Sequence, residues 1–217
     1  MSETSASLAD IQPRKAPVQA RSRARFETIL ETALALIMEQ GSDTMSMREI
    51  ATRAGISIAS LYQYFPDKAA IIATLAERCF EEGRDYTEAV FAPVRDPVAF
   101  EHAVQTLAEG HFARLRDDPA SLAIWRASQS DPRLQAQDDA DEQAHTRIVS
   151  EALGRAAPHI AAEKRQHYAR LMVSVLSNCI RTSVQHAPEE GRVALELCQR
   201  YVLTPSLNAF FSQNEEA

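Results

Sequence analysis

One short stretch of the chain, residues 46–68 (SMREIATRAGISIASLYQYFPDK), carries side chains suited to hydrogen bonding with nucleic acid. The guanidinium of Arg48 can donate two hydrogen bonds to a guanine or can bridge phosphates. Two tyrosine hydroxyls and the amine of Lys68 can donate to phosphate oxygens. Ile58 and Ala59 offer only apolar contact, for example to a thymine methyl group. Because few polar side chains are available to the bases, DNA shape would carry part of any sequence preference.

Two short helices joined by a glycine turn are predicted to position these side chains. Ser46 can cap the first helix in a capping box with Glu49, and Gly55 can adopt the left-handed conformation that ends it. Ser57 can cap the second helix, which Pro66 ends. This order is typical of the helix-turn-helix, whose second helix enters the major groove of DNA. An αα-hairpin without a DNA-binding role has the same outline, but the small, non-acidic start of the second helix favours close approach to base edges.

The stretch resembles the N-terminal domain of the TetR/AcrR family of bacterial transcriptional regulators, over about residues 21–82. The matching residues are Ile29, Ala33, Gly41, Thr44, Met47, Ile50, Ala51, Ala54, Gly55, Ile56, Ser57, Leu61, Tyr62, Gln63, Tyr64, Phe65 and Lys68. The resemblance implies contacts with base edges from Ile58, Ala59 and Ser60, with Arg48 near the groove. It implies phosphate contacts from Ser46, Tyr62, Tyr64 and Lys68. Ser57 and Gln63 complete the predicted DNA-binding set, although Gln63 can equally stay solvated, and Leu61 and Phe65 are expected in the core.

Composition is compatible with an ordinary globular protein. The chain has 217 residues, 45% of them hydrophobic, and only 6 glycines, which disfavours a turn-rich β fold. It has no apolar run of the roughly 18 residues that a membrane helix needs, and no apolar signal segment at its start. We therefore expect a cytoplasmic protein with no membrane association. The net charge is −7, but residues 14–68 hold eight basic and six acidic side chains, so the acidic excess lies beyond residue 68.

Helical periodicity and proline positions predict an all-α fold. Three Asp-Pro pairs, at 96–97, 118–119 and 131–132, each place a capping aspartate before a proline suited to the first helical turn. The predicted helices cover 22–40, 47–54, 58–64, 67 to about 84, 97–116, 119–129, 132–156, 161–186 and a last helix from Pro188. Pro205 should kink or end this last helix. No segment shows the period-two alternation of a strand.

Three parts of the chain are expected. Residues 1–20 are predicted to form a flexible basic tail, which either solubilises the protein or follows DNA. Residues 21–82 would form a three-helix DNA-binding domain with its motif at about 46–65, and residues 83–217 a helical domain for effector binding and dimerisation. The cysteines, Cys79, Cys179 and Cys198, show no close pairing, and buried free thiols are expected.

The family resemblance implies that the second domain binds a small-molecule effector and pairs with a second subunit. The candidate pocket residues are Phe100, Val104, Leu107 and His111, on one stripe of a middle helix, together with Trp125 and Asn178. Packing within the core is the favoured interpretation of His111 and Trp125, and Asn178 suits either a hydrogen bond between helices or a ligand contact. The candidate dimer-interface residues are Leu171, Val175, Leu176, Ile180, Val193, Leu197 and Tyr201, on the last two helices. Part of each of these faces is expected to pack within the subunit.

The sequence thus predicts a homodimeric transcriptional regulator that binds a near-palindromic operator. A repressor released by an effector is the reading that the resemblance favours. An activator of the same fold, or a helical interaction protein that does not use its DNA-binding module, remain the alternatives. We expect no enzyme, because the chain lacks a Gly-rich phosphate loop and the G-x-S-x-G and H-E-x-x-H motifs. No catalytic residue, metal or cofactor is expected.

Overall fold

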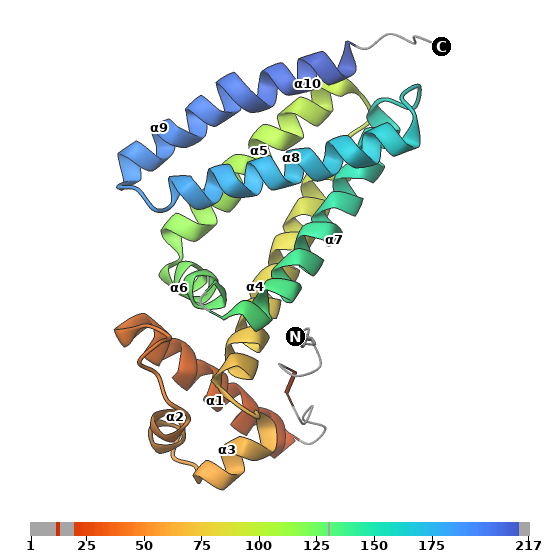
Figure 1. The fold of residues 1–217 in the computed structure, drawn as a ribbon. Coiled ribbons are helices and arrows are strands. Elements are labelled where there is room, and N and C mark those ends of the chain that lie inside the picture. Colours follow the sequence, from red (N-terminus) through yellow and green to blue (C-terminus); the bar gives the residue numbers. More distant parts are fainter. Residues whose placement is uncertain (1–11, 14–19, 130, 213–217) are drawn as a thin grey trace, which may run out of the picture. The chain divides into compact units, whose positions relative to one another are not determined.

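The computed structural model describes residues 12–13, 20–129 and 131–212, and every regular element within them is a helix, which confirms the predicted all-α class (Figure 1). The helices are α1 (Ala20–Gln40), α2 (Met47–Arg53), α3 (Ile58–Tyr64), α4 (Lys68–Phe91), α5 (Pro97–Asp117), α6 (Pro119–Ser128), α7 (Pro132–Ala156), α8 (Ala162–Ser183), α9 (Pro188–Cys198), η2 (Gln199–Leu203) and α10 (Thr204–Phe211). None of the helices described is both long enough and apolar enough to cross a membrane. Most of the predicted N-terminal tail lies outside the described residues.

The aspartates of the three Asp-Pro pairs cap helices as the sequence predicts. Asp96 accepts from the backbone N–H of Ala99 at 2.8 Å, and Asp118 accepts from that of Ala120 at 3.0 Å. Asp131 likewise accepts from the backbone N–H two residues ahead, at 2.9 Å. Each carboxylate thereby satisfies an N–H group that the helix itself leaves without a partner.

The chain divides into two compact units. Unit 1 comprises Met1–Glu81 and Asp118–Asp139, and unit 2 comprises Glu82–Asp117 and Ala140–Ala217. The first division falls next to the boundary expected at residue 82. The segment 118–139, which was expected in the second domain, is instead part of unit 1. Proline positions indicate where helices start, but they carry no information about which unit a helix packs against.

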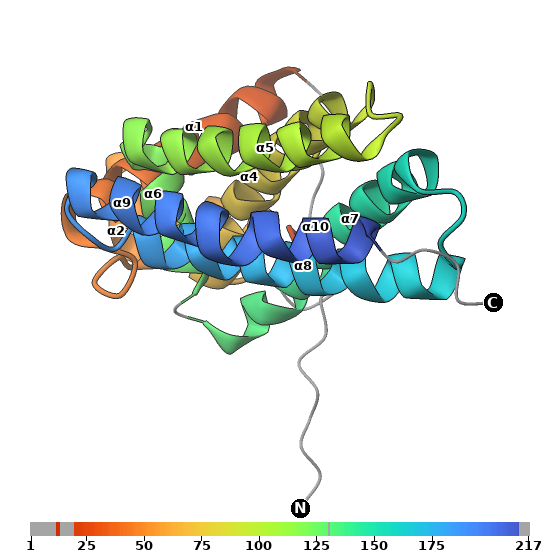
Figure 2. The ribbon, with the colours of Figure 1, turned by 90° about the horizontal axis from the view of Figure 1, so that it is seen from above.

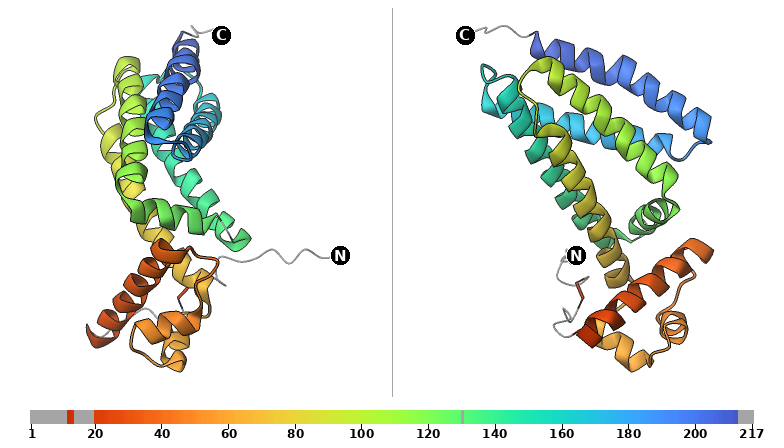
Figure 3. Two further views of the ribbon diagram at one scale, coloured as in Figure 1. Left: turned by 90° about the vertical axis from the view of Figure 1, so that its left-hand side faces the viewer. Right: turned by 180° about the vertical axis from the view of Figure 1, so that it is seen from behind.

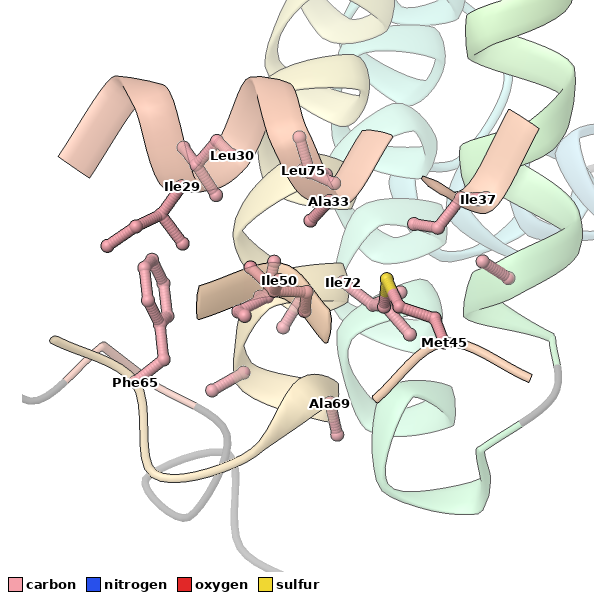
Figure 4. Packing of buried hydrophobic residues seen from close by; sticks show 14 of the residues in the cluster. Ile29, Leu30, Ala33, Ile37, Met45, Ile50, Phe65, Ala69, Ile72 and Leu75 are labelled. Atoms are coloured by element: carbon pink, nitrogen blue, oxygen red, sulfur yellow. The ribbon is translucent and has the colours of Figure 1, made fainter. Parts of the chain in front are cut away.

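Unit 1 is organised around a core between α1 and α4. Ile29, Leu30 and Ala33 on α1 are at most 1% exposed, and Figure 4 shows Ile29 directly above the ring of Phe65. Phe65, the residue that ends α3, also stacks on Phe26 with ring centroids 5.0 Å apart. Because burying a large apolar side chain contributes roughly 1.5–3 kcal/mol, these contacts hold the short α3 in place.

Helix α6 and the start of α7 complete unit 1. Ile124 on α6 and Leu134 on α7 are 6% and 1% exposed and belong to the same hydrophobic cluster as α1. Arg133 donates to Asp67, which precedes α4, at 2.7 Å. Helix α6 therefore packs on α1, which no periodicity in the sequence could indicate.

Unit 2 contains α5, most of α7 and the C-terminal helices. Helices α8 and α9 form an antiparallel hairpin, and Figures 2 and 3 both show α9 and α10 running along α8. The rings of Phe91, Phe100 and Phe211 pack in sequence, with centroid distances of 5.2 and 5.7 Å. Arg155 on α7 donates to the backbone carbonyls of Phe91 and Val94, which ties the end of α4 to α7.

The last helix changes its winding before Pro205. Residues Gln199–Leu203 form a π-helical turn, in which the N–H of Thr204 donates to the carbonyl of Gln199. Proline has no N–H to donate and its ring crowds the preceding turn, so the helix widens there before α10 begins. The sequence predicts a kink or an end of the helix at Pro205; the structure has a widened helical turn just before this proline instead.

The prediction of free thiols is wrong for two of the three cysteines. Cys179 on α8 and Cys198 on α9 form a disulfide, with Cα atoms 6.5 Å apart and a separation of 19 positions in the sequence. Cys79, on α4, takes no part in this disulfide. A separation of 19 residues carries no pairing signal by itself, and the hairpin that brings the two helices together supplies the proximity.

Candidate nucleic-acid interface

The helix-turn-helix is built by caps at both of its helices. Ser46 Oγ accepts from the N–H of Glu49 at 3.2 Å, and Ser57 Oγ accepts from the N–H of Ser60 at 3.1 Å. Between the two helices Gly55 has a φ of +66°, a left-handed conformation that L side chains rarely adopt. The Glu49 carboxylate accepts from the Gln40 side chain at 2.9 Å, which links α2 to the end of α1.

Helix α3 exposes one face and buries the other. Ile58 and Tyr62 are 41% and 42% exposed, and Ala59 and Gln63 beside them are also exposed. Leu61, on the opposite face, is fully buried. The exposed face therefore contains four of the predicted DNA-binding residues, spaced so that they point the same way from the helix.

Four further predicted residues, between positions 46 and 60, are at least partly exposed. Ser46, Arg48 and Ser57 are exposed, and Ser60 is half-buried. A hollow along α2 is lined by Ser46, Arg48, Glu49, Thr52 and Arg53. Arg53 pairs with Glu39 at 2.7 Å, whereas Arg48 is exposed and forms no ion pair with any of the described residues. Within this part of the chain, a phosphate or a guanine edge can therefore approach Arg48 without breaking an ion pair.

Two predicted phosphate contacts have internal partners. Tyr64 is only 5% exposed, and its hydroxyl lies 3.0 Å from Ser22 Oγ on α1. The Lys68 amine donates to the carbonyls of Ser42, Asp43 and Met45, at 2.9, 3.0 and 3.3 Å. Contact with DNA stays a prediction for both, but in the structure they act as connectors. The sequence could not separate Tyr64 from Tyr62, because only the packing of α3 shows which ring faces α1.

The predicted effector-pocket residues on α5 lie together in unit 2. Phe100, Val104 and Leu107 are at most 4% exposed and follow one side of the helix. His111, one turn further on, lies 3.4 Å from the hydroxyl of the fully buried Thr87. Three buried apolar side chains and one polar group thus follow one side of α5 within unit 2.

A polar cluster from three helices surrounds His111. Its ring packs edge-on against His145 of α7, with centroids 5.9 Å apart. His145 lies 3.4 Å from Asp141, which also accepts from Arg84 of α4 at 2.6 Å. Burial, followed by electrostatic interaction with His145 and Arg114, lowers the pKa of His111 to about 4, and the Asp141 carboxylate opposes this shift. His111 is therefore neutral at neutral pH and can offer one donor and one acceptor.

Two predicted pocket residues do not join this group. Trp125 lies on α6, in unit 1. Asn178 is exposed on α8, where its amide donates to the carbonyl of Ser174 at 2.9 Å, and it lines a groove against α9. Neither residue belongs to the α5 stripe, and the sequence does not specify which helix each of them packs against.

The predicted dimer-interface residues fall into two sets. Leu171, Val193, Leu197 and Tyr201 are 59%, 52%, 51% and 64% exposed, and Val175 is half-buried. Leu176 and Ile180 are each 6% exposed, so their side chains pack largely within unit 2, and their part in a dimer interface stays a prediction. Val202, which the predicted interface set does not include, is 46% exposed next to Tyr201. A broad apolar surface on α8 and α9 thus stays uncovered within the subunit; it is called the α8–α9 face below.

Comparison with known protein families matches both parts of the chain. The family described as "Bacterial regulatory proteins, tetR family" matches residues 29–75, which span α2, α3 and their packing partners. The family described as "Tetracyclin repressor-like, C-terminal domain" matches residues 100–209.

Individual relatives agree with these family matches. The transcriptional repressor KstR of Rhodococcus jostii is 32% identical over 103 residues, 48% of this chain and 47% of KstR. The regulator BetI of Yersinia pestis is 30% identical over 116 residues, 51% of this chain and 57% of BetI. The matched stretch thus spans about half the length of these curated relatives.

The fold is shared with solved structures over most of the chain. The SmeT–triclosan complex superposes with a TM-score of 0.64 at 20% identity, covering 86% of this chain and 91% of SmeT. A TetR-family regulator from Pectobacterium atrosepticum superposes with a TM-score of 0.68 at 16% identity, covering 92% of this chain and 100% of that one.

Proposed function

The chain belongs to the tetR family of bacterial regulatory proteins, and we propose that it is a sequence-specific DNA-binding repressor that acts in the cytoplasm. In this proposal two copies pair through the α8–α9 face, bind a near-palindromic operator and leave it when unit 2 takes up a small-molecule effector. The observation that carries the proposal is the exposed face of α3. The helix is capped at its start, and its opposite face packs against the buried core.

The chemistry of α3 supports DNA as the ligand. Its exposed residues, from Ile58 to Gln63, carry no acidic group that would repel phosphates. Gln63 can form two hydrogen bonds with an adenine, and Arg48 can do so with a guanine. Tyr62 is 42% exposed, and a tyrosine hydroxyl can donate to a phosphate oxygen. Base contact is thus assigned to Arg48, Ser60 and Gln63, and phosphate contact to Ser46 and Tyr62.

Homodimer formation is supported by the α8–α9 face. Four large apolar side chains on it are more than half exposed, namely Leu171, Val193, Leu197 and Tyr201. Apolar patches of this kind on a folded domain mark interaction sites. Pairing of like faces gives a twofold dimer, and such a dimer would present two copies of α3 to two half-sites.

Effector binding in unit 2 is supported by the α5 surface and by one relative. The apolar run from Phe100 to Leu107 ends at the neutral His111, a combination that suits a ligand with an apolar body and one polar group. The related SmeT structure is a complex with triclosan. Release from DNA requires only that the ligand bind the DNA-incompetent conformation more tightly than the competent one.

Selection from a pool of random duplexes at near-physiological salt tests the proposal. The native protein should enrich a near-palindrome. An Arg48→Ala/Tyr62→Phe variant should lose this enrichment, because it removes one base contact and one phosphate contact without touching the core. Arg147→Ala is the matched control, since it removes an exposed charge from α7 in unit 2.

The outcomes separate DNA binding from the interaction-protein alternative. Enrichment by the native protein and by Arg147→Ala, with steep weakening as salt rises, supports phosphate contacts and the release of counterions. No enrichment by a protein shown to be helical and dimeric would refute the DNA-binding proposal. A Ser60→Asn variant adds a second check, because it should change the preferred sequence rather than only the affinity.

A further inference from the structure

The disulfide of unit 2 lies within the exposed apolar surface of the subunit. A groove on the α8–α9 face is lined by Leu171, Ser174, Val175, Asn178, Cys179, Thr182, Ser183, Ala194 and Cys198. Both disulfide partners thus contribute to the same groove. Cys179 is half-buried, and Cys198 is 8% exposed. The covalent link therefore crosses from α8 to α9 within the surface that the proposed dimer uses.

Both ends of the α8–α9 hairpin are held by other contacts. At the turn, a Cβ on Gly191 would lie 2.2 Å from the carbonyl oxygen of Ser183, so α9 passes α8 closely there. At the far end, the rings of Tyr168 and Phe210 stack with centroids 3.9 Å apart, and the Tyr168 hydroxyl lies 2.9 Å from Ser206 Oγ. The disulfide is the covalent tie between these two anchors.

The residues on either side of Cys198 are ones that the proposed dimer would bury. The π-helical turn Gln199–Leu203 begins directly after it, and Tyr201, the most exposed large apolar residue of α9 and η2, lies within that turn. Leu197 precedes the disulfide by one residue. The bond thus fixes the segment whose side chains the dimer would bury, at a point where the helix is irregular.

A disulfide is unusual in a protein of this proposed function. A regulator works where the DNA is, and in the bacterial cytoplasm thiols are kept reduced, so that disulfides there are usually transient, catalytic or redox-sensing. We infer that Cys179 and Cys198 are a thiol–disulfide exchange site that sets the shape of the α8–α9 face, so that reduction weakens the dimer and, through it, operator binding. This inference rests on the proposed dimeric DNA-binding function.

The exchange needs a dithiol in one direction and a hydroperoxide in the other. A thiolate of the dithiol attacks one sulfur and displaces the other as a thiolate, and the second thiol of the reagent then closes a cyclic disulfide, leaving two protein thiols. In reverse, a hydroperoxide oxidises one protein thiolate to a sulfenic acid and is reduced to an alcohol. The other thiol displaces water to restore the bond. Because the proposed dimer covers the groove, exchange takes place in the free subunit.

The test compares oxidised and reduced wild-type protein, so that it does not depend on a variant that folds. The thiols are counted by alkylation and mass spectrometry after treatment with diamide or with dithiothreitol. Dimer dissociation is measured by analytical ultracentrifugation, and operator binding is measured on the selected duplex. We expect reduction to raise the dimer dissociation constant at least about tenfold, a change of one decade in the equilibrium constant.

Cysteine variants assign the effect to this pair. The Cys179→Ser/Cys198→Ser protein should dimerise as weakly as reduced wild type in both conditions, with unchanged helical content. Cys79→Ser is the matched control, and should respond to dithiothreitol as wild type does. A response that disappears in Cys79→Ser but persists in the double variant would overturn the assignment.

The remaining outcomes separate this inference from the proposed function. Equal dimerisation and equal operator binding in the two redox states would overturn the inference and leave the DNA-binding function standing. Three alkylated cysteines after diamide treatment would overturn it as well. A dimer that responds to dithiothreitol but binds no duplex in either state would support the redox site and refute the DNA-binding function.

Discussion

His111 offers a prediction whose size follows from its surroundings. The side chain lies among Thr87 of α4, His145 of α7 and Arg114 of its own helix, and its pKa is lowered from 6.5 to about 4, mainly by burial. Between about pH 6.5 and pH 4, His111 is therefore protonated in the unfolded chain and neutral in the folded protein. The free energy of unfolding is unaffected by this group above the range, and it decreases as the pH falls through the range.

The magnitude follows from the two pKa values. Each pH unit between them costs about 1.4 kcal/mol of unfolding free energy, because one more proton is bound by the unfolded state. Between about pH 7.5 and about pH 5 the loss from this one group is about 2 kcal/mol. That is a large fraction of the 5–15 kcal/mol that typically stabilises a domain.

Urea unfolding followed by circular dichroism measures this loss. The His111→Gln variant removes the titrating group while keeping a side chain that can hydrogen-bond to Thr87. Its unfolding free energy should fall by about 2 kcal/mol less than that of wild type over the same pH range. The control is His102→Gln, at an exposed position on α5. If wild type and His111→Gln lost stability in parallel, the ring would not be held neutral by burial and the reasoning would be refuted.

Three further substitutions test contacts in the two units by urea or thermal unfolding. Ser57→Ala removes the acceptor for the N–H of Ser60 and should cost unit 1 about 1 kcal/mol; an unchanged midpoint would show that the cap is dispensable. Lys68→Met removes a charged donor to three loop carbonyls and should cost about 2 kcal/mol without DNA present. Loss of DNA affinity alone would contradict its role as a connector. Gly191→Ala places a Cβ against the Ser183 carbonyl and should cost about 1–3 kcal/mol, and normal stability with an intact disulfide would show that the hairpin can move apart.

Local signals in the sequence were sufficient for the helices. Serine and aspartate caps need a hydrogen bond only two or three residues away, so Ser46, Ser57 and Asp96 could be assigned without knowing the fold. Gly55 likewise adopts the left-handed turn that its position predicted. The all-α class and the short α2 and α3 helices follow from these signals and from helical periodicity.

Contacts between distant parts of the chain could not be read in the same way. An apolar stripe shows that a helix buries a face, but Leu176 and Leu197 both lie on such stripes and only Leu176 is buried within the subunit. The same limit applies to Trp125, which packs in unit 1, and to the pairing of Cys179 with Cys198. In each case the partner is chosen by the packing of whole helices, which a single sequence does not encode at a fixed spacing.

The composition of α3 gives the dimer a role in specificity. Among the exposed residues predicted to bind DNA, only Arg48 and Gln63 can form paired hydrogen bonds with a base, and each such pair discriminates by about 1–3 kcal/mol. One half-site therefore yields roughly 2–6 kcal/mol, at or below the range of about 4–10 kcal/mol that separates specific from non-specific binding. Two copies on a near-palindrome double this contribution. A change that loosens the α8–α9 face, including reduction of its disulfide, should therefore lower discrimination between sequences more than it lowers the non-specific affinity of each subunit.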